Sequence, residues 1–184
     1  MANDQSSHLG LKPLNLQYGN VRVNAYRVNT GANLFLYQPV ILNNSGQAVT
    51  PAIFDATGIL GSIVGFVDAN RASVPSGMDA LSGSPYLPST NNAYALVADD
   101  PNQLFIMEED TGGTLIGSAN SSMLTVSFTY LATTGNTTTG ISTALIDRST
   151  IANDTGGVLT LVRPADTVNQ DGTINDVTGA FAKW

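Results

Sequence analysis

The sequence predicts an all-β protein, a single-domain β-sandwich or barrel of jelly-roll-like type with an extended N-terminal arm. Short apolar segments rich in β-branched and aromatic residues recur along the chain at fairly even spacing. Clusters of Gly, Pro, Asn and Asp separate them, as turns do between short strands. The 184 residues suffice for one domain that buries about two thirds of its unfolded surface. We therefore expect an arm over residues 1–20 and a β-rich domain over residues 21–184.

The N-terminal segment predicts the arm. Its first ten residues are small and mostly polar. The apolar run 11–16 that follows is too short for a helix and is constrained by Pro13. The N-terminus lacks the basic and apolar regions of a secretory signal, and no apolar run approaches the ~20 residues of a membrane span. We expect no membrane partner.

Three longer segments predict the first strands. Residues 21–28 alternate apolar and polar side chains, which is the period of a strand buried on one face. Residues 34–42 form a second run, in which Pro39 indicates a sheet edge or a bulge. Residues 58–67 are apolar with three glycines, which favours a buried strand whose backbone is closely approached.

The remaining predicted strands are shorter. They cover residues 94–98, 103–108, 124–131, 141–147 and 158–162. Residues 70–92 hold several prolines and glycines among Ser, Thr and Asn, and form the longest predicted loop. Loops of this length in compact domains are often functional.

The composition excludes several classes of partner and site. Charged residues make up 11% of the chain and the net charge is −7, so Ser, Thr, Asn, Gln and Gly dominate the expected surface. Such a surface suits contact with another protein, because few charges need desolvating. The seven Lys and Arg are scattered, so we expect no nucleic-acid partner. The absence of cysteine excludes disulfides and thiolate chemistry.

The candidate catalytic groups favour a protein that is not an enzyme. His8 is the single histidine and lies in the polar arm, without a buried carboxylate to orient it. Acids at 99–100 and 108–110 flank a predicted strand, but a glycosidase pair also needs a sugar-binding cleft. No aromatic-rich segment lies near them. Adjacent acids at turns are more typical of a solvated edge that discourages strand pairing.

One segment resembles part of a calcium loop. Residues 167–176 place Asn169, Asp171 and Asn175 at plausible ligand positions around a turn glycine. The first and twelfth loop positions hold threonine in place of the usual acids. Asn, Asp and Gly are also ordinary turn residues. We expect no metal or other cofactor, with these three residues as the weak candidates if calcium binds.

Several blocks, in order along the chain, carry a family resemblance. They are residues 10–14 followed by 26–28, the glycine-rich strand 59–66, the strand, Asp-Pro turn and Phe-containing strand of 94–108, the Thr-Gly-rich turn and strand of 134–147, and residues 159–166. Together these blocks touch most of the chain, and each alone is a common β pattern. In this order and spacing they resemble the capsid decoration (cement, or head-stabilising) proteins of tailed bacteriophages.

The resemblance implies a structural virion protein. Made in the host cytoplasm, it would bind the exterior of a phage capsid as a homotrimer and cement neighbouring subunits of the major capsid protein. Extended contacts from the arm would strengthen this binding. The candidate contact residues are Leu9, Leu11, Lys12, Pro13, Leu14, Leu16 and Tyr18.

The sequence leaves one alternative open. A virion-surface β-sandwich could instead bind host glycans through the loop 70–92, with Tyr86 and Tyr94 as contacts. Glycan sites of this kind usually present exposed aromatic rings, whereas aromatics are 7% of this chain. Which face meets a partner is not determined by the sequence.

Overall fold

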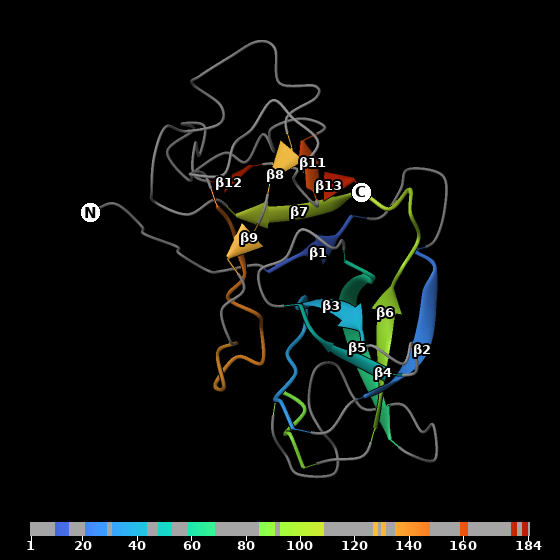
Figure 1. Ribbon diagram of the computed structural model, residues 1–184. Coiled ribbons are helices and arrows are strands. Elements are labelled where there is room, and N and C mark those ends of the chain that lie inside the picture. Colours follow the sequence, from blue (N-terminus) through green and yellow to red (C-terminus); the bar gives the residue numbers. More distant parts are fainter. Residues whose placement is uncertain are drawn as a thin grey trace, which may run out of the picture.

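The described part of the chain consists of strands, turns and loops, without a helix (Figure 1). The computed structural model describes residues 10–14, 21–28, 31–43, 48–52, 59–68, 85–90, 93–108, 127–128, 130–131, 135–147, 159–161, 178–179 and 182–183. Over these residues the all-β prediction is confirmed. A search of the same residues for a helix long and apolar enough to cross a bilayer finds none.

Five strands pair in a ring in the order β2-β4-β3-β5-β6 (Figure 1). They are β2 (Val23–Val28), β3 (Pro39–Leu42), β4 (Ala48–Pro51), β5 (Gly61–Asp68) and β6 (Ala93–Ala98). Four of the pairings are antiparallel. The ring closes through a short parallel contact in which Arg27 and Val28 of β2 pair with Ala48 and Val49 of β4. The result is a small, curled barrel.

Shorter strands lie over one end of this barrel, where Figure 1 shows β1 and β7. β7 (Phe105–Glu108) pairs with β1 (Lys12–Pro13) and β12 (Thr178–Gly179). β9 (Tyr130–Leu131) pairs with β10 (Leu145–Ile146), and β11 (Leu159–Leu161) lies between β8 (Ser127–Phe128) and β13 (Ala182–Lys183). The predicted strand 124–131 thus contains two strands, β8 and β9, which join different sheets.

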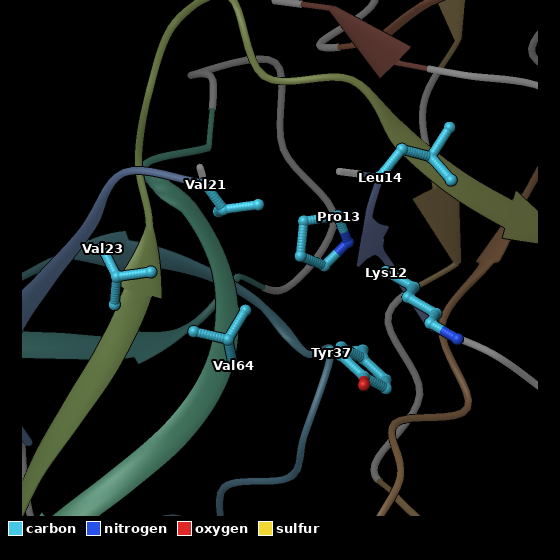
Figure 2. Close-up of a pocket in the computed structure, with 7 residues that line it drawn as sticks. All are labelled: Lys12, Pro13, Leu14, Val21, Val23, Tyr37 and Val64. Atoms are coloured by element: carbon cyan, nitrogen blue, oxygen red, sulfur yellow. The ribbon is translucent and has the colours of Figure 1, made fainter. Parts of the chain in front are cut away.

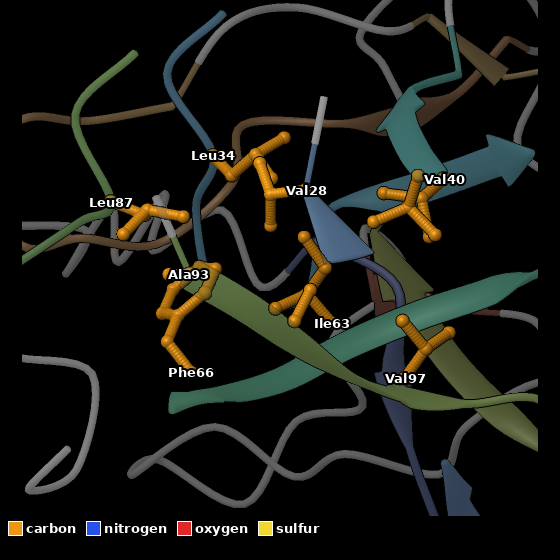
Figure 3. Close-up of a cluster of buried hydrophobic side chains, with 10 residues drawn as sticks. Val28, Leu34, Val40, Ile63, Phe66, Leu87, Ala93 and Val97 are labelled. Atoms are coloured by element: carbon orange, nitrogen blue, oxygen red, sulfur yellow. The ribbon is translucent and has the colours of Figure 1, made fainter. Parts of the chain in front are cut away.

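The inner core fills the barrel (Figure 3). On β6 the inward positions are Ala93, Ala95 and Val97, which alternate along the strand and are at most 2% exposed. Small side chains on β6 leave room for Phe66 of β5, which lies opposite Ala95. The remaining members of this cluster are Val28, Leu34, Val40, Val49, Ile63 and Leu87.

A second core lies between the barrel and the shorter strands. Ala98, the residue after inward-facing Val97, belongs to it and so turns away from the barrel interior. Alternation along β7 directs Phe105 and Met107 into the same cluster. Its other buried members are Leu11, Ala52, Ile59, Ala144, Ile146 and Leu159.

Pro39 differs from its predicted place. It is the first residue of β3, a strand with neighbours on both sides, and not a residue of an edge or bulge. Proline is accepted at the first position of a strand, where its missing N–H interrupts no ladder. The preceding chain does not extend the strand, since Leu34 and Leu36 make only isolated bridges. The bulge of this barrel lies on β5 instead.

Gly61 confirms the predicted close approach of backbones. A Cβ atom at this position would lie 2.1 Å from the carbonyl oxygen of Ala98 on β6. Real Cβ atoms do not approach a backbone oxygen so closely. Only glycine therefore allows β5 to start against β6 at this point.

Gly61→Ala is expected to lower the free energy of unfolding by about 1–3 kcal/mol, because the clash is with backbone that cannot rotate away. Urea unfolding followed by circular dichroism measures the change. Gly65→Ala on the same strand is the matched control, since its Cβ would meet only a Leu96 methyl group at an ordinary 3.4 Å. Equal midpoints for the two variants would contradict the prediction.

Candidate functional site

The segment of residues 10–14 is built into the fold by backbone hydrogen bonds. The N–H of Leu11 donates to the Tyr37 carbonyl at 2.7 Å, and the Ser62 hydroxyl donates to the Leu11 carbonyl. Three residues on, the N–H of Leu14 donates to the Leu104 carbonyl at 2.8 Å. These bonds join the segment to both the barrel and β7. Over residues 10–14 the expected arm is therefore part of the folded body.

A buried amide holds the end of this segment. The side chain of Gln103 is 1% exposed, and its Nε2 donates to the carbonyls of Leu14 and Leu104, both at 2.6 Å. A buried amide that satisfies two backbone acceptors costs little desolvation energy and restricts both strands. Leu14 is thus held by hydrogen bonds at both its N–H and its carbonyl.

Tyr37 adopts a backbone conformation that is rare for a bulky residue. Its φ of 59° lies in the left-handed region. Its N–H donates to the Ile63 carbonyl at 2.7 Å while its carbonyl accepts from Leu11, so tertiary bonds hold both of its backbone groups. The ring lies beside the Lys12 side chain, whose Nζ is 5.9 Å from the ring centroid. Strained residues of this kind persist where the surroundings over-determine them.

A bulge in β5 adds one residue between two inward-facing side chains. Ile63 pairs with Val97 and Gly65 pairs with Leu96, so Val64 has no opposite partner on β6. The extra residue lets Ile63 and Phe66 both face the barrel core. Val64 lies on the outer side, half-buried, and packs against the second core.

These features meet at a surface groove of about 510 Å³, shown in Figure 2. Three valines lie on one side, and residues of the docked segment lie on the other with Tyr37 (Figure 2). The lining is Lys12, Pro13, Leu14, Val21, Val23, Tyr37 and Val64. Leu14, Val21 and Val64 also pack against the second core, so the groove is the open continuation of that core. Val23 is 39% exposed.

A carboxylate fixes the valine side of the groove. Asp99 is 7% exposed and accepts hydrogen bonds from three side chains. The donors are Arg22 Nε at 3.0 Å, Asn24 Nδ2 at 2.8 and 3.1 Å, and the Tyr26 hydroxyl at 2.5 Å. Arg22 also donates to the Asp99 backbone carbonyl at 3.3 Å. Val21 and Val23 are the chain neighbours of Arg22. The hydrogen bonds between Arg22 and Asp99 therefore hold these two valines near the end of β6.

The cluster sets the ionisation of its members. Burial alone raises the pKa of Asp99, but the hydrogen bonds from Asn24, Tyr26 and Arg22 together outweigh it and lower that pKa below its usual value. Burial and the bond to the carboxylate raise the pKa of Tyr26. The interpretation of the acids at 99–100 as a solvated edge is wrong for Asp99. This residue is a buried, fully bonded structural carboxylate.

The predicted contact residues fall into three groups. Lys12, Pro13 and Leu14 line the groove. Leu11 is a core residue with no exposed surface, which corrects the expectation that it contacts a partner. Leu9, Leu16 and Tyr18 lie outside the described residues, as do His8 and the candidate calcium ligands Asn169, Asp171 and Asn175. Within the described ranges no three acidic or histidine side chains gather to hold a metal.

The Thr-Gly-rich turn has a packing role. Its Asn136 Oδ1 accepts from the N–H of Thr138 at 2.8 Å, which closes the turn locally. Gly140 has a φ of 73°, and a Cβ there would lie 1.9 Å from the Pro85 carbonyl oxygen. Only glycine fits this site. The turn therefore holds the described end of the loop 70–92 against the body.

Comparisons with known proteins add no assignment. No protein-family model matches the sequence, and the searches of curated proteins and of solved structures find no match. The phage decoration resemblance stays a prediction.

Leu11→Ala is expected to lower the free energy of unfolding by about 2–5 kcal/mol, because it leaves a cavity in the second core. Lys12→Ala, one residue on and exposed, is expected to change it by less than about 0.5 kcal/mol. Urea unfolding of both variants tests this. Similar small effects would show that the segment does not support the core.

Asp99 is expected to make stability depend on acid pH. Its folded-state pKa lies below its ordinary value of 3.8, so its contribution is complete above that value and is lost as the pH falls through the lower one. Urea midpoints measured from about pH 5 down to about pH 2 should fall more steeply in the wild type than in Asp99→Asn. Tyr26→Phe removes one donor and should move the loss toward higher pH. Parallel profiles for all three proteins would refute this.

Proposed function

We propose that this chain is a structural protein of a tailed-phage virion that binds the outer capsid surface and cements neighbouring major capsid subunits. The observation that supports this most is the apolar groove, which three of the expected contact residues line. In this proposal the chain is a single jelly-roll-like domain with an N-terminal arm over its first residues, and it acts as a homotrimer.

The groove suits stable adhesion. Its lining is mostly aliphatic and continuous with a packed core, so a partner that fills it gains about 25 cal/mol for each Å² of apolar surface removed from water. The docked segment and the Asp99 cluster hold both sides in place before binding, which lowers the ordering cost. Three such sites in a trimer would bind together and gain avidity.

Glycan recognition through the loop 70–92 has less support. Tyr86, one of its two expected contacts, stacks on Phe35 with ring centroids 5.1 Å apart and an interplanar angle of 23°. One face of its ring is thereby used in packing. Tyr94 lies within β6 and is half-buried.

The test is uptake of the purified protein by expanded, undecorated phage shells, measured by co-sedimentation. We expect saturable binding, and shells that resist heat better when decorated. Removal of residues 1–9 tests the arm while keeping the segment 10–14, whose Leu11 belongs to the core. A correctly folded protein that never sediments with shells but binds a glycan array would replace this function with the recognition module.

A further inference from the structure

We propose that the groove receives a short apolar segment of the shell subunit, and that an acidic side chain of this segment pairs with Lys12. The inference rests on the proposed function and specifies the chemistry of its partner.

Two residues with irregular backbone geometry line the groove. The positive φ of Tyr37 and the bulge at Val64 each depart from regular β geometry, and both residues line the groove. Backbone strain and bulges gather where a site needs side chains directed in a particular way. Their convergence on one apolar surface indicates a binding site.

The charge of the lining indicates an acidic partner. Lys12 carries the only charge among the seven lining residues, on a chain whose net charge is −7. The nearby guanidinium of Arg22 already pairs with Asp99 at 3.0 Å. A carboxylate that approaches the groove therefore meets the ammonium group of Lys12, which lies beside the Tyr37 ring.

The size of the groove and the strand at its border indicate that the groove binds side chains of the partner segment. The open groove of about 510 Å³ has room for a few side chains. β1 lies at the edge of its sheet and pairs with β7 alone within the described part of the chain. Pro13 in this strand has no N–H. A partner strand added at this edge would therefore lack one of the backbone hydrogen bonds of a regular sheet. Aliphatic side chains inserted into the groove therefore supply most of the affinity.

Shell binding by groove variants is the first arm of the experiment. Val64→Asp and Val23→Asp are expected to weaken binding at least about tenfold, because each places a charge in an apolar contact. Val23 is exposed in the free protein, so its variant is expected to fold even if Val64→Asp does not. Lys12→Gln is expected to weaken binding about two- to fivefold and to reduce its dependence on salt.

A matched control separates the groove from overall charge. Thr137→Asp changes the net charge by one, as Lys12→Gln does, but lies in the exposed Thr-Gly-rich turn. It is expected to bind shells as the wild type does. Equal loss in Thr137→Asp and Lys12→Gln would overturn the assigned role of Lys12.

The absence of cysteine permits a direct identification of the partner segment. Ala25→Cys adds a single thiol at an exposed position two residues from Val23, on the same face of β2. This thiol carries a photo-crosslinker, and mass spectrometry identifies the captured peptide on decorated shells. We expect a shell peptide with aliphatic residues and an Asp or Glu.

The outcomes are distinct. Capture of a second copy of this chain, or of a shell peptide without an acid, would overturn the inference while leaving shell binding intact. So would wild-type binding by the valine variants. Failure of the wild type itself to bind shells would overturn the proposed function, and the inference with it.

Discussion

The docking of residues 10–14 against the barrel is the interaction on which the rest of the structure depends. Hydrogen bonds to Tyr37, Ser62 and Leu104 place Leu11 over the outer face of the barrel, where it closes the second core. Without this segment, Ala98 and Phe105 would lose a neighbour in that core and one side of the groove would be missing. A short stretch near the N-terminus thus connects the barrel to the outer strands.

The two sides of the groove are held by different physical means. Backbone hydrogen bonds and the buried amide of Gln103 hold the docked segment. A buried carboxylate holds the valine side, and it is stable there because three donors compensate its desolvation. Each side is anchored to a different part of the fold, so the groove is preformed. Preformed apolar surfaces suit a protein that works by adhesion.

The groove also relates the two irregular features of the barrel. A regular β5 would not place both Ile63 and Phe66 inside, and the bulge that achieves this leaves Val64 on the outer surface. Similarly, the turn that brings the chain into β3 gives Tyr37 its positive φ and leaves its ring beside Lys12. Packing of the inner core and shaping of the surface are therefore linked.

The sequence by itself determined the all-β class and the positions of β2, β5, β6 and β7, because alternation of side chains and turn residues are local signals. It predicted an extended arm at the N-terminus, and this interpretation did not foresee the burial of Leu11. Only the tertiary structure decided that Leu11 lies in a core, that Asp99 is buried, and that Tyr37 and Val64 line a groove. The reason is that these properties depend on partners far away in the chain: Ser62 is 51 residues from Leu11, and Asp99 is 77 residues from Arg22. No local pattern of side chains encodes such distances.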